Sequence, residues 1–340
     1  MDLSPGETMS KPLVASSREL ASSRALDRLA MRAVIVVPTF RRPAMLAATL
    51  ASLRLQTASV PFAVVVVEND ATGLAGAAVA RAALETGDIH GLCVVERSQG
   101  NVHAINAGFA TALEAFPQAE YVLMIDDDEV ASPGWLDAMV ATAERENADV
   151  VGGPVVPRFA AAAPALMARH PVFWPAYDTS GPVDMIYGSG NCLMRRRVFD
   201  RLGRPAFDPR FNFLGGGDMD FFTRCRKAGF KSYWAAEAEI TETVPAQRAK
   251  VGWILKRGLR IGAINRAVDR KNAPGAGGLL RILAKDLAIL PLALGRAVGA
   301  FVKTGNPLIA VHPLAVAAGR IGGIFGQEPE PYRAESMPSP

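Results

Sequence analysis

Residues 121–135 read YVLMIDDDEVASPGW, and this stretch decides how the rest of the chain is interpreted. Five mostly apolar residues run directly into Asp126, Asp127, Asp128 and Glu129. A short apolar run that ends in polar residues is typical of a buried strand. Four adjacent carboxylates repel one another at neutral pH unless a cation or hydrogen-bond donors lie among them. The stretch therefore predicts a cation-binding strand end, and the alternative is a solvated acidic turn that caps the next helix.

The same unit recurs along the chain. Apolar runs at 33–38, 61–70, 92–97, 121–128 and 148–159 alternate with helical patterns at 41–56, 74–87, 101–116 and 133–147. Strands that alternate with helices of this length favour a doubly wound, parallel α/β sheet. Ligands of such sheets bind outside the carboxyl ends of the strands.

The amino-acid composition limits the classes of ligand and partner that the protein can have. The 340 residues are 50% hydrophobic and 21% charged, with a net charge of +4, which is typical of a globular protein. The mild basic bias suits an anionic small substrate or an anionic lipid surface. No Lys/Arg stripe with interleaved aromatic residues is present, so no nucleic-acid partner is expected. Three widely spaced cysteines, Cys93, Cys192 and Cys225, indicate a reducing compartment without a disulfide framework or a cysteine-based zinc site.

Polar residues follow the first four apolar runs, at 39–42, 68–70, 97–100 and 126–129. Because the carboxyl ends of parallel strands share one edge of a sheet, these residues are predicted to converge. Asp126 and Asp128 have the D-x-D spacing that, together with diphosphate oxygens, suits Mg²⁺ or Mn²⁺.

Two further interpretations of the acidic residues remain open. MIDDDEV also matches an aspartyl-phosphatase motif with Asp126 as nucleophile and Asp128 as acid/base, although that motif opens the first strand of its domain. FLGGGDMDFF lacks the strand–GxGxxG–helix context of a dinucleotide site. Its three glycines instead allow a tight turn that brings Asp218 near a ligand, and the alternative for Asp218 and Asp220 is simple helix capping.

Taken in order, several motifs resemble those of the family 2, GT-A-type glycosyltransferases. They are VIVVPTFRRP, VVVEND, SQGNVHAINAG, MIDDDE, GGGDMDFF and KRGLRIG, and they cover about residues 32–265. The GGGDMDFF wording, the ETVPAQR segment and the R-x-x-R-x-G that follows are similar to bacterial exopolysaccharide glucosyltransferases of the succinoglycan type.

The resemblance implies a nucleotide-diphospho-sugar transferase fold, with a doubly wound, mixed and mainly parallel sheet. It also implies an inverting transfer of a sugar from a UDP-sugar to a glycan acceptor, which is expected to be lipid-linked, in exopolysaccharide or cell-surface glycan synthesis. Asp218 would be the general base, and Asp128 with Asp126 would hold Mn²⁺ or Mg²⁺. Arg257 and Arg260 would offset charge on the diphosphate. The implied nucleotide-binding residues are Pro38, Thr39, Arg41, Glu68, Asn69, Asp70, Asn106, Asp126 and Asp127.

The chain departs from the family pattern in several places. Gly217 stands where a Glu usually precedes the base, Ile105 where an Arg is common, and Thr241 where a His is often found. Ile261 replaces the Trp of processive synthases, which favours addition of a single sugar. These departures leave open a nucleotide-sugar-binding protein with a decayed site.

Acceptor contacts are predicted at Trp174, Tyr187, Gly188 and Asn191, with ordinary core packing as the alternative for the aromatic residues. The expected organisation is a flexible extension (1–31), a catalytic domain (32–245), a helical membrane-surface region (246–326) and a disordered tail (327–340). Within the catalytic domain, 32–156 would bind nucleotide and 157–245 the acceptor.

Basic residues recur between apolar patches in the helical region, with Pro291 and Pro313 as expected breaks. This pattern favours amphipathic helices on an anionic membrane surface. No segment offers about 20 uninterrupted apolar residues, which argues against a transmembrane helix. The expected location is therefore cytoplasmic and peripheral, on the inner face of the cell membrane.

Overall fold

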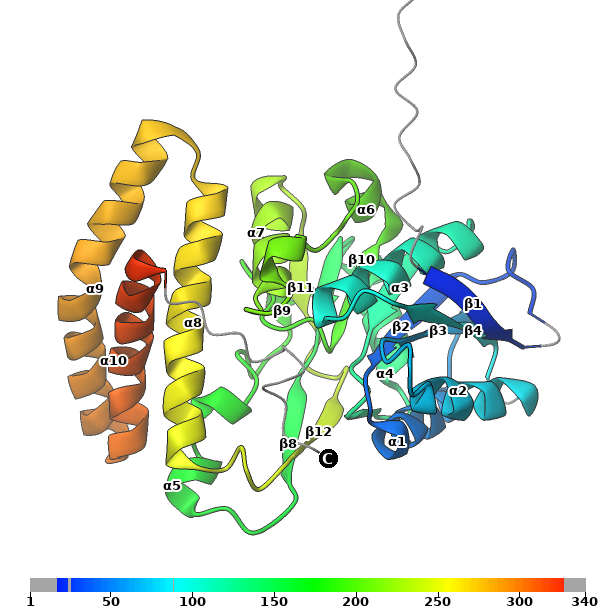
Figure 1. Cartoon of the computed structure of the whole chain (residues 1–340), viewed down its shortest axis with the longest axis horizontal. Helices are drawn as coiled ribbons and strands as arrows, with labels where there is room; N and C mark the ends of the chain where they lie inside the picture. The colour runs from blue at the N-terminus through cyan, green and yellow to red at the C-terminus, as the bar shows by residue number, and fades with distance from the viewer. Residues whose placement is uncertain (1–16, 24–25, 88, 327–340) are drawn as a thin grey trace, which may run out of the picture.

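A nine-stranded mixed sheet forms the centre of the protein, and a three-helix bundle stands beside it (Figure 1). The computed structural model describes residues 17–23, 26–87 and 89–326. The strand order of the large sheet is β1-β4-β3-β2-β5-β10-β7-β11-β9, and a second sheet has the order β6-β12-β8. The strands are β1 (Ser17–Ser22), β2 (Ala33–Thr39), β3 (Phe62–Glu68), β4 (Gly91–Glu96), β5 (Tyr121–Met124), β6 (Glu129–Ala131), β7 (Val150–Gly152), β8 (Val155–Phe159), β9 (Gly181–Pro182), β10 (Cys192–Arg195), β11 (Ser232–Trp234) and β12 (Ile240–Val244).

Helices cover both faces of the large sheet, which explains why its central strands are apolar throughout. On β2, Val34 and Val36 pack with α3, while Ile35 and Val37 face the side covered by α1, α2 and α4. Strands β4, β3, β2 and β5 are parallel neighbours, as the alternating pattern predicts. The α-helices are α1 (Pro43–Arg54), α2 (Ala75–Glu85), α3 (Asn101–Ala115), α4 (Trp135–Arg145), α5 (Ala165–Ala168), α6 (Arg196–Leu202), α7 (Gly217–Lys227), α8 (Val251–Asn272), α9 (Gly275–Thr304) and α10 (Pro307–Gly322), and the 3₁₀ turns are η1 (Pro171–Phe173), η2 (Pro209–Phe211) and η3 (Gly323–Phe325).

The structure corrects the expected flexible extension, because β1 lies within it. Its segment SRELAS pairs antiparallel with β4 at the edge of the sheet. An edge strand has one unpaired side and needs no apolar run, so its sequence carries little strand signal. The predicted disordered tail at 327–340 lies outside the described residues.

One predicted strand and one later segment are each divided between the two sheets. The expected strand at 148–159 becomes β7 in the large sheet and β8 in the small one. The segment from Lys231 likewise becomes β11 and β12, which again lie in different sheets. The sequence pattern did not indicate β10, which pairs antiparallel with both β5 and β7. These strands are short and find their partners far along the chain, so local periodicity could not identify them.

The last three helices form the bundle, with α10 packed against both α8 and α9. Arg320 of α10 is buried and forms ion pairs with Asp269 of α8 and Asp286 of α9. Pro291 and Pro313 lie inside α9 and α10, which continue through them, so the expected breaks are wrong. By length and composition, the segment Pro307–Phe325 would suffice to cross a membrane, although it packs within the bundle.

Candidate functional site

The acidic turn at the end of β5 is held in place by β2 and by the residues that follow it. Thr39 Oγ1 donates to Asp127 Oδ2 at 2.8 Å, and the Phe40 amide donates to the same oxygen at 3.4 Å. Arg42 Nη1 lies 3.2 Å from Asp127 Oδ1 and 2.8 Å from Asp128 Oδ2. The ends of two neighbouring parallel strands therefore meet as predicted, and the cation among the carboxylates is a guanidinium group.

The pKa values of the buried carboxyl groups in the acidic turn are raised, because too little positive charge lies near them. Desolvation, together with the charges of Asp128 and Asp127, raises the pKa of Asp126 to about 8. Desolvation raises the pKa of Asp127 to about 6, although Arg42 opposes this shift. The pKa of buried Glu129 is also raised well above its ordinary value by desolvation and by Asp126. A divalent cation placed here would favour the ionised carboxylates.

Glu242 is a further acidic residue at this site, and the sequence interpretation gave it no role. In the small sheet β12 pairs antiparallel with β6, and the register sets Glu242 opposite Glu129. Desolvation raises the pKa of Glu242, an effect that Arg248 opposes and Asp128 reinforces. Glu242 also forms an ion pair with Arg248. Its alternating strand ITETV was the available sequence signal, but only the register between the two strands brings it to the acidic turn.

Asp218 lies in the first turn of α7, immediately after three glycines. Gly216 has φ +89°, and a Cβ there would lie 2.3 Å from Ile264 Cγ2 of α8, so both conformation and packing require glycine. Desolvation raises the pKa of Asp218, whereas the amides of Met219 and Gly188 and the charge of Arg257 oppose that shift. A carboxylate with a raised pKa is better suited to accept a proton near neutral pH.

The loop 187–191 connects Asp218 to the acidic turn. Its Gly188 amide interacts with Asp218, and a Cβ at Gly190 would lie 2.5 Å from Glu129 Oε1 and 3.0 Å from Asp126 Oδ2. Cys192, the next strand residue, is buried, and Asp126, Asp218 and Glu129 all raise its thiol pKa after desolvation. Both acidic groups therefore lie near the same thiol, so Asp218 and the D-x-D segment belong to one site.

Helix α8 contributes positive charge to the same region. The charge of Arg257 acts on both Asp218 and Glu242, which places this guanidinium near the base candidate and the acidic cluster. Arg260 is partly buried one turn further along α8. The roles of Arg257 and Arg260 at a diphosphate stay predictions.

Several predicted nucleotide-binding residues have side chains that hydrogen-bond to backbone groups of the protein. Glu68 accepts from the Asp70 and Ala77 amides and so caps α2. Asn69 bonds Glu96 O, Ser98 O and the Gly100 amide. These two side chains position the strand ends, while Asp70 pairs with Arg41 at 2.8 Å and Pro38 is buried in β2.

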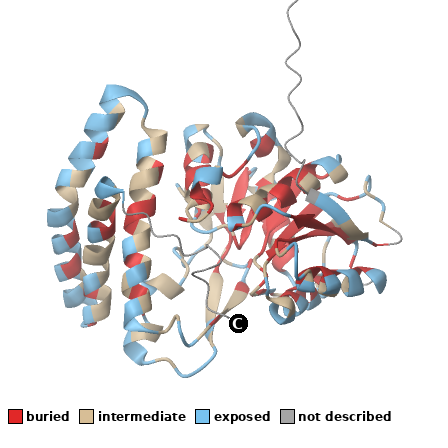
Figure 2. Ribbon diagram, in the orientation of Figure 1, coloured by how far each residue is buried: buried red, intermediate tan, exposed pale blue. Residues whose placement is uncertain are grey.

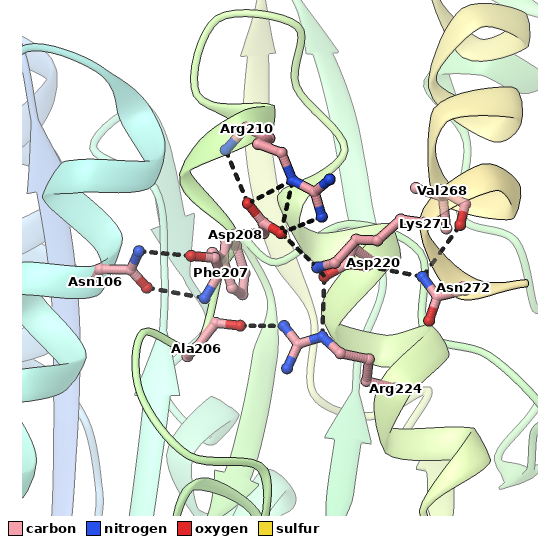
Figure 3. A network of polar contacts seen from close by, with 10 residues as sticks. All are labelled: Asn106, Ala206, Phe207, Asp208, Arg210, Asp220, Arg224, Val268, Lys271 and Asn272. Atoms are coloured by element: carbon pink, nitrogen blue, oxygen red, sulfur yellow. Dashed lines mark hydrogen bonds and ion pairs between the residues drawn. The ribbon is translucent and has the colours of Figure 1, made fainter. Parts of the chain in front are cut away.

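Two other predicted site residues are engaged in the same way. Asn106 bonds the backbone N–H and C=O of Phe207 (Figure 3). Asn191 donates to Pro154 O and Ala238 O and accepts from Trp135 Nε1, so both of its N–H groups are occupied within the protein. Trp174 and Tyr187 are exposed, as acceptor-contacting aromatic residues require. Their contacts, and those of Gly188 and Asn191 with an acceptor, stay predictions.

Asp220 is separate from this site. It is fully buried and meets Arg224 Nε at 2.9 Å, Lys271 Nζ at 2.6 Å and Asn272 Nδ2 at 2.9 Å (Figure 3). These contacts tie α7 to the end of α8. Of the two aspartates of GGGDMDFF, Asp218 therefore faces the site, and Asp220 holds α7 and α8 together.

The donor chemistry at the acidic turn fits a divalent metal, although the ligand set is incomplete in the protein alone. Among residues 17–23, 26–87 and 89–326, no three His, Cys, Asp or Glu side chains are grouped closely enough to bind one. The available ligands are carboxylate oxygens, which hard cations prefer, and the remaining ligands would have to come from a bound diphosphate or water.

Comparison with known proteins agrees with this geometry. Residues 32–260 match the family described as glycosyltransferase like family 2. Over 157 residues the chain is 32% identical to the succinoglycan biosynthesis protein ExoM of Rhizobium meliloti. The matched region covers 46% of this chain and half of ExoM. Over 234 residues it is 27% identical to the O-antigen biosynthesis protein RfbC of Myxococcus xanthus, covering 63% of this chain and 17% of RfbC.

A solved structure has the same fold. The mannosyltransferase PcManGT from Pyrobaculum calidifontis, in complex with GDP-Man and Mn²⁺, superimposes with a TM-score of 0.56 over 91% of this chain and 92% of that one. The identity is 19%, so this likeness concerns the fold alone. Because the family match covers well over half of the 340 residues, the chain belongs to glycosyltransferase family 2 and has the GT-A fold.

Proposed function

We propose that this glycosyltransferase moves a sugar from a UDP-sugar to a lipid-linked glycan acceptor with inversion, in the synthesis of an exopolysaccharide or cell-surface glycan. The observation that carries the proposal is that Asp218 and the acidic turn both lie near Cys192, and therefore near each other. A single displacement requires a base and a diphosphate-binding segment within one site. The names of ExoM and RfbC, two relatives from polysaccharide biosynthesis, support the choice of product class.

In this proposal Asp218 accepts the proton of an acceptor hydroxyl as the hydroxyl oxygen attacks the anomeric carbon, and the bond to the diphosphate breaks. Loop 187–191 orients the base through the Gly188 amide. Arg257 lies where its charge can stabilise the departing diphosphate. Tyr187 and Trp174 offer exposed aromatic faces to the acceptor.

Asp128 and Asp126 would hold Mn²⁺ or Mg²⁺, with Glu242 beside them. The metal would supply positive charge that offsets the negative charge of the leaving diphosphate. Binding of a metal at Asp128 requires Arg42 to release that carboxylate, since Arg42 Nη1 now lies 2.8 Å from it.

Gly217, one of the departures from the family pattern, has a steric explanation here. A Cβ at this position would lie 3.0 Å from Phe207 Cδ2 and 3.2 Å from Val102 Cγ2. A side chain at this position would therefore require Phe207 and Val102 to shift by a few tenths of an ångström, so the close packing of these residues favours glycine here. The decayed-site alternative is decided by the following experiment.

Calorimetric titration with UDP, with and without Mn²⁺, tests the nucleotide site, and UDP release from a panel of UDP-sugars with a membrane lipid extract tests turnover. Asp218→Asn should lower turnover by about 10²- to 10⁴-fold and leave UDP binding unchanged. Asp200→Asn, on the exposed end of α6, is the matched control. UDP binding without turnover in the unmodified chain would establish a binding protein, and no UDP binding under either condition would overturn the proposal. GDP, the nucleotide portion of the PcManGT ligand, is titrated in parallel to test whether the site prefers a uracil or a guanine nucleotide.

A further inference from the structure

Helix α9 carries a continuous row of exposed large apolar side chains. The residues recur every three or four positions, which places them on one side of the helix. Each is at least 48% exposed, and Leu287 is 81% exposed. The row comprises Leu280, Leu283, Leu287, Leu290, Leu294 and Val298.

This row is not the face that packs in the bundle. The buried positions of α9 are Ile282, Ala293 and Ala297. The helix packs mainly against α10 and lies at the outer side of the bundle, away from both sheets (Figure 1). Figure 2 shows this helix exposed along most of its length. A row of leucines this long has no counterpart elsewhere among the exposed apolar residues of the described chain, and such a patch marks an interaction surface.

The exposed charges of α9 are all positive. They belong to Arg281, Lys285, Arg296 and Lys303. The single acidic residue of the helix, Asp286, is paired internally with Arg266 and Arg320. Lys285 also pairs with Asp269 of α8 at 2.7 Å, and no carboxylate of α9 opposes the other three cations. An exposed helix that combines leucines with such cations is complementary to an anionic lipid surface.

The positions beside the row argue against a second helix as the partner. Helices that pair through a heptad seam usually carry charged residues beside it, which fix partner and register. Here Ala284 and Pro291 flank one side of the row, and Leu279 flanks the other. The apolar surface is therefore broader than a coiled-coil seam. Lipid, unlike a partner helix, imposes no register on such a surface.

We propose that α9 lies in the interface of an anionic membrane, with the Leu280–Leu294 row in the acyl region and the cations near the headgroups. The helix has 30 residues and so is about 45 Å long, enough to anchor the whole bundle along the surface. The ion pairs of Arg320 fix α9 to α8, the helix that carries Arg257, so the membrane contact and the candidate active site belong to one rigid unit. The inference does not depend on the proposed sugar transfer.

Flotation of the full chain with vesicles tests it, using phosphatidylcholine alone and phosphatidylcholine with phosphatidylglycerol. The unmodified chain should bind the anionic vesicles and bind the neutral ones less. Leu280→Gln/Leu287→Gln should lower binding by about tenfold or more, because two leucines leave the acyl region. Leu29→Gln/Leu55→Gln removes two side chains of similar exposure outside the bundle and should leave binding unchanged.

Arg281→Gln/Arg296→Gln should reduce binding to the anionic vesicles and leave binding to the neutral ones unchanged. All variants should keep the thermal unfolding midpoint of the unmodified chain, because the changed side chains are exposed. The proposal is overturned if the unmodified chain floats with neither vesicle, or if both leucine pairs behave alike. It is also overturned if the chain is a dimer by sedimentation equilibrium, stays off vesicles, and becomes a monomer on Leu280→Gln/Leu287→Gln. UDP binding, measured in parallel, reports separately on the nucleotide site.

Discussion

The guanidinium group of Arg42 lies 2.8 Å from Asp128 Oδ2, so a positive charge from the loop after β2 already stands at the D-x-D segment. Arg42 also contacts Asp127, and its charge acts on Asp126. It thereby offsets part of the repulsion within the acidic turn. The same contact places Arg42 in competition with any metal that binds Asp128.

Arg42→Gln should therefore have two opposite effects. Without metal, the free energy of unfolding should fall by about 1–2 kcal/mol, because the acidic turn loses a partly buried counter-charge. The affinity for Mn²⁺ should rise, because Asp128 no longer has to exchange a guanidinium group. Urea unfolding and Mn²⁺ calorimetry measure the two effects, with Arg81→Gln on the exposed side of α2 as control. A parallel loss of stability and of Mn²⁺ affinity would instead make Arg42 part of the metal site.

Asp220→Asn should lower stability rather than chemistry. The carboxylate is fully buried and lies within 2.9 Å of Arg224, Lys271 and Asn272. Its neutralisation removes the ion pair of partly buried Arg224 and one of the two of Lys271, which also pairs with Asp208. The expected loss is about 3 kcal/mol in urea unfolding. Asp200→Asn should change the same measurement by less than about 0.5 kcal/mol. If Asp220→Asn leaves stability intact and abolishes turnover, the separation of Asp218 and Asp220 into different roles is wrong.

Glu242→Gln should weaken metal-dependent UDP binding by about tenfold, since this carboxylate adds negative charge beside Asp128 and Asp126. UDP binding without metal should change little or improve. Calorimetry with UDP in Mn²⁺ and in EDTA separates these effects. Glu237→Gln is the control, because Glu237 is an exposed carboxylate that accepts from Ser180 Oγ at 2.8 Å. Equal losses in Mn²⁺ and in EDTA would point to nucleotide contact instead.

His170 should contribute a loss of stability as the pH falls from about 6.5 to about 4, opposite in sign to the contribution of the buried carboxyl groups with raised pKa values at the acidic turn. Burial, with the neighbouring His312 ring 4.9 Å away, lowers the pKa of His170 from 6.5 to about 4. The unfolded chain therefore binds a proton at a pH where the folded chain does not, and this difference favours unfolding below 6.5. The expected change is about 2 kcal/mol across this interval.

His170→Asn tests this origin, because its side-chain oxygen can still accept from the Val172 amide, as Nδ1 of His170 does at 3.1 Å. Relative to the unmodified chain, this variant should gain about 2 kcal/mol of unfolding free energy between pH 6.5 and pH 4. His90→Asn, on the exposed approach to β4, should retain the full dependence. An unchanged pH dependence in His170→Asn would assign the effect to the carboxylates.

The alternation of apolar strands and helices from residue 33 to 147 was sufficient to predict the first half of the fold. Strands buried on both faces carry a continuous apolar signal, and α1, α3 and α4 each begin at or next to a Gly or Pro. The second half of the fold could not be predicted from the hydrophobic pattern of the sequence. Strand β10 inserts between β5 and β7, and β8 and β12 leave the large sheet, because short strands are defined by partners more than a local window away.

The sequence by itself determined the family, the position of the acidic segment at a strand end, and Asp218 in the first turn of a helix. These features depend on residue type and order along the chain, and interactions between residues close in sequence are enough to produce them. Only the tertiary structure decided that Glu242 faces the acidic turn, that Asn69 and Asn106 hold backbone, and that α9 turns its leucines outward. Each of these depends on which surfaces pack against one another, and the free energy of packing is set by residues distant in sequence.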